Sequence, residues 1–234
     1  MSQKSFLVDG VGQITIYKRH GAKNVRLSLS ASGKVRVSQP YFTPYQAGIA
    51  FVKKNRTWLM ERAVKEALPP LASGQQIGKK HQLIIARSTS NVVSTHIKAG
   101  VIKVRAPASA SRPTVQEAAV SACERALKKE AEELLVGRLA ELARQHGFSY
   151  QSARIKKLTA RWGSCSSDRV ITLSYYLVQL PWELIDYVIL HELTHTRQMN
   201  HGPKFWQELT TFVPDARARQ KWIRQHKPRL APNP

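Results

Sequence analysis

The sequence predicts an α+β protein in which a β-rich N-terminal region precedes a part dominated by helices. Three observations lead to this prediction: short stretches that alternate apolar and polar residues before residue 112, a long helical pattern over 113–146, and an apolar helix over 181–193 that contains His-Glu-x-x-His. We therefore expect two domains, a β-rich region at 1–112 and a catalytic domain at 113–234.

The first region is expected to form strands followed by a helix. Residues 11–17 and 25–29 alternate as strands do, and a Ser-Gly pair at 32–33 favours a hairpin link to a further strand at 34–37. A loop bounded by two prolines then leads into a helix expected over 45–67. The apolar face of this helix is expected to pack on the strands.

A similar order of elements recurs in weaker form. Strands are expected at 81–85 and 99–105, and the helix over 113–146 ends at Gly147. The segments Gly-Lys-Val-Arg-Val and Gly-Val-Ile-Lys-Val-Arg occupy equivalent places, each ahead of a Pro-containing loop and a helix. Duplication of one strand-strand-helix unit and chance convergence on a common hairpin pattern both explain this recurrence.

The last third of the chain is expected to alternate strands and helices around the motif helix. Strands at 154–162 and 170–176 flank a turn rich in Gly and Ser, and the second strand could present an edge to an extended peptide. Two amphipathic helices, over 203–212 and 214–226, follow the motif helix, and each begins with Pro.

His191, Glu192 and His195 form the most informative motif of the chain. Two histidines four residues apart lie on one helical face, so both imidazoles can reach one metal ion. Glu192 projects from a neighbouring angle and can polarise a metal-bound water instead of binding the metal. The motif therefore predicts a zinc hydrolase.

The helix around the motif is apolar on nearly every side, which is typical of a buried helix. Pro181 suits its first turn, and Glu183 and Asp186 lie near its positive end. Polar groups inside such a helix are costly unless they are satisfied, and one zinc ion satisfies two imidazoles. The alternative is that both histidines are core residues bonded to backbone carbonyls, with Glu192 reaching solvent.

A catalytic zinc normally takes three protein ligands, so a third ligand is needed. His201 follows His195 by six residues, and Asn200, Gly202 and Pro203 around it favour a turn that brings it back to the metal. Glu208, from the following helix, is the competing candidate.

Several motifs together resemble a known family. Arg-Trp-Gly-Ser-Cys-Ser-Ser at 161–167, Ile-Thr-Leu-Ser at 171–174 and His-Glu-Leu-Thr-His-x5-His-Gly-Pro-Lys-Phe-Trp from His191 are similar to the YgjP-like metallopeptidase family, distant kin of the SprT-like proteases. The resemblance extends from about residue 18 to residue 212. One segment departs from it, because 88–96 is more polar than the strand expected there.

The resemblance implies a zincin-like fold for the catalytic domain, zinc held by His191, His195 and His201, and Glu192 as general base. It also places the Arg-Trp-Gly-Ser-Cys block beside the site, where Arg161 or the turn at Ser164 would stabilise an oxyanion. For the remaining residues near the site we expect core packing by Trp162, Phe205 and Trp206, a tight turn at Gly163, and, as a minor alternative, an inhibitory fourth ligand in Cys165.

The chain carries a formal net charge of +22, from 37 Lys and Arg against 15 Asp and Glu. Such an excess suggests a polyanionic partner, nucleic acid first, although a generally basic surface without a shaped groove explains it nearly as well. The two cysteines are 42 residues apart and predict no disulfide framework. With no leader pattern and no apolar run of roughly 18 residues, the sequence suggests a cytoplasmic protein outside the membrane.

Three functions remain open at this point. The first is a zinc metallopeptidase that cleaves a peptide or protein substrate. The second keeps the zinc and Glu192 but cleaves a phosphoanhydride bond in a nucleotide, because arginines would suit an acidic small molecule. The third is a nucleic-acid-binding module in which zinc is structural and Glu192 is idle. The sequence gives no oligomeric state.

Overall fold

The computed structural model describes residues 2–29, 35–66, 69–109 and 111–230, with the side chains of 63–66 excepted. The chain divides into two compact units, Met1–Leu68 and Pro69–Pro234. Mixed α+β architecture with a β-rich N-terminal region is confirmed. Among the described residues, no helix combines the length and the apolar character needed to cross a bilayer.

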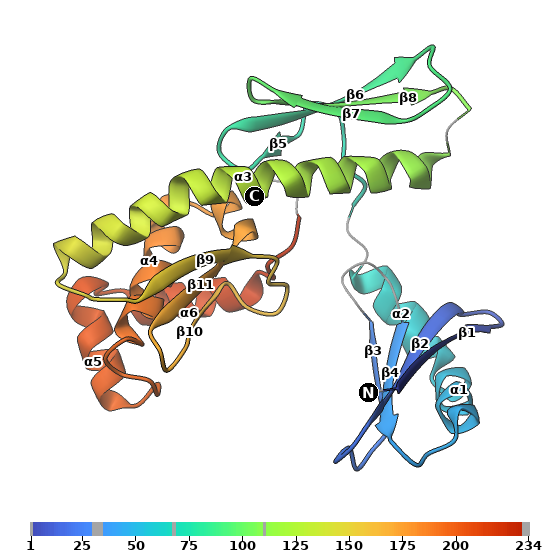
Figure 1. Ribbon diagram of the computed structural model, residues 1–234, viewed down its shortest axis with the longest axis horizontal. Helices are drawn as coiled ribbons and strands as arrows, with labels where there is room; N and C mark the ends of the chain where they lie inside the picture. The colour runs from blue at the N-terminus through green and yellow to red at the C-terminus, as the bar shows by residue number, and fades with distance from the viewer. Residues whose placement is uncertain (1, 30–34, 67–68, 110, 231–234) are drawn as a thin grey trace. The chain divides into compact units, whose positions relative to one another are not determined.

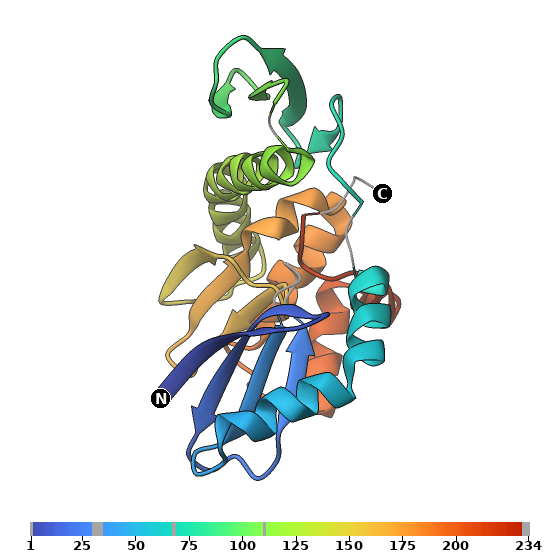
Figure 2. The same ribbon diagram turned by 90° about the vertical axis from the view of Figure 1, so that its right-hand side faces the viewer.

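The first unit is a four-stranded sheet with two helices, α1 (Tyr45–Lys54) and α2 (Arg56–Glu66), packed on one face (Figures 1 and 2). Its strands are β1 (Ser2–Val8), β2 (Gly12–Arg19), β3 (Arg26–Leu29) and β4 (Val35–Pro40), in the order β1-β2-β4-β3. The central pair, β2 and β4, is parallel, and the two outer pairs are antiparallel.

The sequence predicted most of this unit, with two exceptions. Strand β1 was not predicted, and the helix expected over 45–67 is interrupted at Asn55, whose side-chain amide donates to the carbonyl of Phe51. An amide that bonds the last turn in this way competes with continued helix formation. Strands β3 and β4 pair as the expected hairpin, while the link at 32–33 lies outside the described residues.

A second four-stranded sheet, in the second unit, repeats the topology of the first. It consists of β5 (Gln76–Ile77), β6 (His81–Ser88), β7 (Ser94–Lys98) and β8 (Val101–Pro107), in the order β5-β6-β8-β7. Again the central pair is parallel and the outer pairs are antiparallel. The recurrence noted in the sequence thus extends to strand order and direction. Residues 89–93 connect β6 to β7, so β7 is a short strand that starts later than expected.

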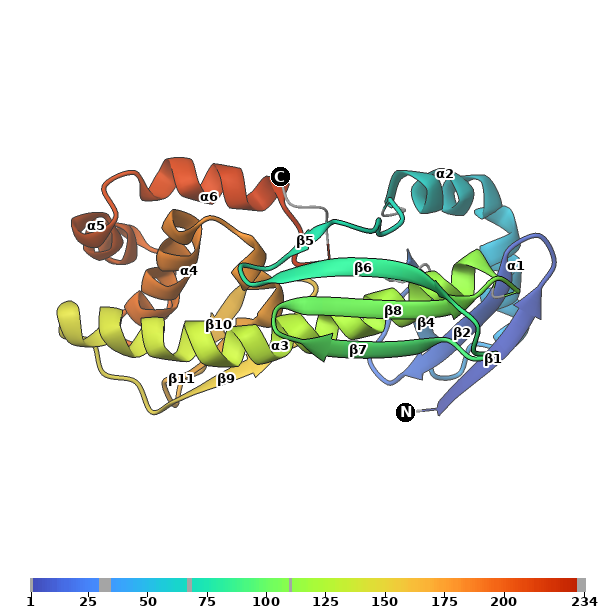
Figure 3. The same cartoon turned by 90° about the horizontal axis from the view of Figure 1, so that it is seen from above.

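Helix α3 (Arg112–Gln145) joins this sheet to the C-terminal region, and Figure 3 shows β6, β7 and β8 lying along it. Its buried carboxylate, Glu130, accepts hydrogen bonds from the backbone N–H groups of Lys79 and Lys80 and bonds the ring of His81. The compact units divide at 68/69, whereas the expected boundary was at 112/113, because the second sheet packs on α3 and so belongs to the second unit.

The C-terminal region after α3 contains a small mixed sheet and, among its described residues, three further helices (Figure 1). The strands are β9 (Ser152–Lys156), β10 (Gly163–Cys165) and β11 (Val170–Ser174), ordered β10-β11-β9 and followed by a 3-10 turn, η1 (Tyr175–Gln179). Helices α4 (Trp182–Thr194), α5 (Pro203–Phe212) and α6 (Ala216–Gln225) follow.

Strand β11 corrects one prediction. It pairs on both sides, with β10 and with β9, so it is central and cannot offer an edge to a peptide. The edge strands of this sheet are β10 and β9. The expected strand at 154–162 also ends early, at Lys156, because the chain must leave β9 to return as β10 on the far side of β11.

Candidate metal centre

Helix α4 positions the first two histidines. Its apolar residues are buried along nearly the whole helix, so its axis is held firmly against α3, α5 and the small sheet. His191 lies in its last turn and His195 follows as the C-cap residue, with helical backbone angles. The two rings therefore leave the same face of α4, with their centroids 4.9 Å apart.

The segment after α4 turns back and brings His201 to the other two rings. The hydroxyl of Thr196 donates to the carbonyl of Leu193 at 2.7 Å, which closes the helix. The indole N–H of Trp206 donates to the carbonyl of His201 at 3.2 Å and holds the third histidine in place. The Nε2 atom of His201 lies 2.9 Å from that of His191 and 3.2 Å from that of His195.

This triad fits a tetrahedral metal ion. Zinc–nitrogen bonds of about 2.0–2.1 Å at tetrahedral angles separate two ligand nitrogens by about 3.3 Å, close to the observed spacing. Nδ1 of His195 lies 3.0 Å from the carbonyl of Gln198 and can donate to it, which leaves its Nε2 bare and directed at the other two rings. His191, His195 and His201 thus could hold one metal ion.

The surroundings keep the histidines neutral, as metal ligands must be. Burial, followed by the charges of His195 and His201, lowers the pKa of His191 to about 3. Burial also lowers the pKa of His195 and of His201. The fully buried ring of Phe205 packs against all three imidazoles, with centroids 4.6–4.9 Å away. The core role expected for Phe205 is confirmed.

Glu208, the competing third ligand, is engaged elsewhere. Its carboxylate accepts a hydrogen bond from the guanidinium of Arg197 at 2.8 Å. It does not belong to the cluster formed by the three histidines.

Glu192 lies beside the triad, against the backbone of β10. The side chain is 6% exposed, and burial raises its pKa to about 8, while the nearby positive charge of Arg161 acts in the opposite direction. A Cβ atom placed on Gly163 would lie 2.7 Å from Cγ and Oε1 of Glu192. Gly163 is therefore more than a turn residue, because its missing side chain leaves the space that Glu192 occupies.

The register of β10 against β11 determines where the other residues of the Arg-Trp-Gly-Ser-Cys block point. The N–H of Ser174 donates a hydrogen bond to the carbonyl of Trp162, and the N–H of Ser166 donates one to the carbonyl of Val170. In an antiparallel pair, hydrogen-bonded and non-hydrogen-bonded residue pairs alternate. The N–H and C=O groups of Gly163 and Cys165 therefore face away from β11. Since Gly163 faces Glu192, the side chain of Ser164 points to the opposite face of the strand. The structure does not bring the Ser164 hydroxyl to the site.

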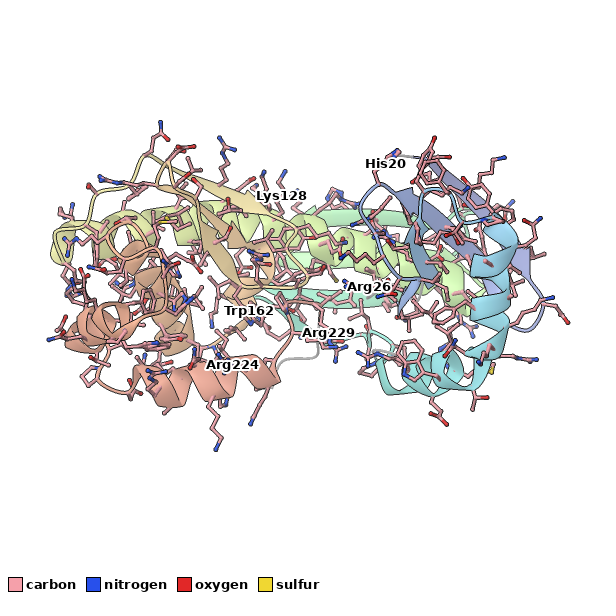
Figure 4. All side chains as sticks on the ribbon, turned by 90° about the horizontal axis from the view of Figure 1, so that it is seen from below. His20, Arg26, Lys128, Trp162, Arg224 and Arg229 are labelled. Atoms are coloured by element: carbon pink, nitrogen blue, oxygen red, sulfur yellow. The ribbon has the colours of Figure 1, made fainter. Side chains whose placement is uncertain are left out.

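Two arginines near the site were missed by sequence reasoning, which treated α6 as part of a general basic surface. Arg217 lies over the ring of Trp206, with its guanidinium carbon 3.6 Å from the centroid. Arg224, labelled in Figure 4, lies two turns further along α6, and its charge reaches both His201 and Tyr187. Arg217 and Arg224 are seven residues apart, which places them on the same face of α6, and this spacing was the signal that the sequence offered.

Three comparisons relate the chain to known proteins. A family model described as "YgjP-like, metallopeptidase domain" matches residues 23–226. A comparison with curated protein sequences gives no match. Among solved structures, similarity was found to the metallopeptidase zymogen of Pyrococcus abyssi abylysin, at 23% identity and a TM-score of 0.37, over 42% of this chain and 99% of that chain. The metallopeptidase zymogen of Methanocaldococcus jannaschii jannalysin is 26% identical, with a TM-score of 0.35, over 39% of this chain and 94% of that chain.

Proposed function

Because the chain belongs to the YgjP-like family of metallopeptidase domains, we propose that it is a zinc-dependent peptidase with His191, His195 and His201 as ligands and Glu192 as general base. The observation that carries the proposal is the convergence of three imidazole Nε2 atoms beside a buried carboxylate. Three neutral nitrogen donors and a separate acid–base group are the components of a hydrolytic zinc site.

The bound zinc would supply Lewis acidity, which activates water and polarises a substrate carbonyl. Glu192 takes a proton from the attacking water and delivers it to the leaving nitrogen. Burial raises the pKa of Glu192 to about 8 in the zinc-free protein, and a cation bound beside it would lower that pKa again, which favours the ionised carboxylate that accepts the proton.

Substrate alignment falls to β10 in this proposal. The outward N–H and C=O groups of Gly163 and Cys165 form a free edge next to Glu192, and an extended peptide could pair with them. Backbone pairing of this kind reads little sequence, so broad specificity is expected. Arg161, whose charge reaches Glu192, is the candidate for stabilising the oxyanion.

A second candidate function is hydrolysis of a phosphoanhydride bond in a nucleotide. The observation that favours it is the presence of Arg161, Arg217 and Arg224 around the site. All three side chains are exposed, and within the described part of the chain none has a carboxylate partner. Arginines that form no ion pair with a carboxylate suit phosphate groups, which they bind through paired hydrogen bonds.

One experiment separates these functions. Purified, zinc-loaded protein is assayed against casein, mixed peptides and nucleoside triphosphates, with Glu192→Gln as the matched control. Loss of peptide cleavage in the variant supports the peptidase, and loss of nucleotide hydrolysis with peptides untouched supports the second candidate. Stoichiometric zinc without either activity would leave zinc in a structural role and contradict both.

A further inference from the structure

The first unit presents a group of aromatic rings and lysines at one end of its sheet. We call this group, made of His20, Tyr41, Phe42 and Tyr45 with Lys4 and Lys18, the aromatic edge. His20 directly follows β2, Tyr41 and Phe42 lie in the loop between β4 and α1, and Tyr45 begins α1. Because β2 and β4 run parallel, with Arg19 opposite Pro40, these segments meet at the same end of the sheet.

The rings are stacked on one another and remain exposed. His20 and Tyr41 stack with centroids 4.0 Å apart and planes 21° apart, and Phe42 meets Tyr41 edge-on at 5.4 Å. Phe42 is 89% exposed and Tyr41 is 37% exposed. Large apolar rings at such exposure contribute little to the core, so they are available to stack on a planar ligand.

Hydrogen bonds from a buried side chain fix the backbone of the loop that carries Tyr41 and Phe42. Gln39 is fully buried, and its side-chain amide donates to the carbonyls of Thr43 and Pro44 at 2.8 and 3.1 Å. The N–H of Thr43 also donates to the carbonyl of Pro40. The backbone beneath Tyr41 and Phe42 is thus held before any ligand arrives, which lowers the entropic cost of binding.

Positive charge surrounds the rings, and negative charge lies elsewhere. Lys18 Nζ lies 4.6 Å from the ring centroid of Tyr45 and 6.0 Å from that of Tyr41, and Lys4 Nζ lies 5.6 Å from that of Tyr45. Of the acidic side chains described in this unit, Asp9 follows Val8 at the opposite end of the sheet and Glu61 is on α2. Figure 4 labels His20 and shows it among side chains at the end of its sheet.

We propose that the aromatic edge binds single-stranded nucleic acid, with bases stacked on Phe42 and on the Tyr41–His20 pair and phosphates bound by Lys4 and Lys18. Exposed rings interleaved with cations are the common design of surfaces that bind single strands without reading sequence. This binding is independent of the metal centre and of the reaction proposed for it.

The test measures binding of the whole zinc-loaded protein to fluorescent single-stranded oligo(dT) and oligo(rU) of about 12 nucleotides, a length that suits a site of this class. The variant Tyr41→Ala/Phe42→Ala is expected to bind at least about tenfold more weakly, since each stacked base contributes the equivalent of roughly five- to a hundredfold in affinity. Lys18→Gln is expected to reduce the slope of log K against log salt concentration by about 0.7.

Matched controls come from the other end of the same unit. Leu7 is an apolar side chain with 85% exposure, near the Val8 end of β1, and Lys53 lies in the last turn of α1. Leu7→Ala and Lys53→Gln are expected to leave affinity and salt slope within about twofold of the wild-type values. Equal losses in these controls, or unchanged binding in the Tyr41/Phe42 variant, would overturn the proposal.

The chemistry of lysines around an exposed Phe also suits an anionic bilayer, and the same variants decide between the two partners. Vesicles of phosphatidylcholine with phosphatidylserine are added in a parallel assay. If the Tyr41/Phe42 variant loses vesicle binding and keeps oligonucleotide binding, the aromatic edge is a membrane contact and the proposal is wrong. Absence of oligonucleotide binding by the wild-type protein has the same consequence.

Discussion

Gly163 and Glu192 are in contact at a point where only glycine fits: a methyl group on Gly163 would lie 2.7 Å from Cγ and Oε1 of Glu192 and 2.9 Å from Cδ. The glycine comes from edge strand β10 and the carboxylate from the last turn of α4. The contact sets the position of the proposed general base relative to the strand on which a peptide would lie.

Replacing Gly163 by Ala is expected to lower kcat by about 10- to 100-fold, because a buried carboxylate displaced by a fraction of an ångström no longer meets the attacking water. Zinc content should stay at the wild-type level, since no ligand moves with it. Steady-state kinetics and metal analysis check both points. Gly137→Ala, a helix position with open space around it, serves as control and should add about 0.5–1 kcal/mol of stability without changing kcat.

Removing the charge of Glu192 is expected to stabilise the zinc-free protein at high pH. The folded state raises the pKa of Glu192 from 4.5 to about 8, so between these values the unfolded chain releases a proton that the folded chain keeps. Stability contributed by the protonated group is therefore lost as pH rises from about 5 to 8. Glu192→Gln, which resembles the protonated form, escapes this loss.

Urea unfolding of both proteins in EDTA at pH 5, 6.5 and 8 measures the difference. The advantage of Glu192→Gln should grow steadily across this range and shrink when zinc is restored, because a nearby cation stabilises the carboxylate. The buried histidines also make stability depend on pH, but both proteins contain them, so their contribution cancels in the difference between the two unfolding free energies. A difference that is the same at every pH would contradict the assigned pKa.

His201→Ala is expected to weaken zinc binding by at least about 100-fold, because it removes one of three ligands and a loss in the supporting shell alone costs 10- to 100-fold. Competition with a chromophoric chelator gives the affinity. Glu208→Gln, which breaks only the ion pair with Arg197, should bind zinc like the wild type. The opposite pattern would make Glu208 the third ligand.

Glu130→Ala is expected to destabilise the second unit by about 3–5 kcal/mol, because it leaves the N–H groups of Lys79 and Lys80 and the ring of His81 without their buried acceptor. Zinc affinity measured on the folded variant should not change, since Glu130 does not contact the histidine triad. Chemical denaturation followed by far-UV circular dichroism measures the loss. A change below about 1 kcal/mol would show that the β5–β6 turn is held by other contacts.

Local features of the sequence predicted much of the molecule. The pattern of apolar residues located α3, the signals at Pro181, Glu183 and Asp186 located α4, and the alternation at 11–17 located β2, because helix and strand formation depends on neighbouring residues. The interval between His191 and His195 predicted their common face for the same reason. The family expected from the motif blocks was confirmed over 23–226.

Pairings between segments that are distant in the sequence could be identified only in the folded structure. Nothing near Ile171 or Leu173 in the sequence indicates that β11 lies between β10 and β9, since strand order depends on contacts across many residues. The same limit explains why the second sheet joined α3, and why the side chain of Ser164 points away from Glu192.

The sequence by itself determined which side chains form the candidate metal centre, because three imidazoles and a carboxylate within eleven residues are brought together by one helix and one turn. Only the tertiary structure decided two features around it: the glycine that makes room for Glu192 and the arginines of α6 near Trp206 and His201. Those neighbours come from segments whose approach is set by core packing, which no local pattern encodes.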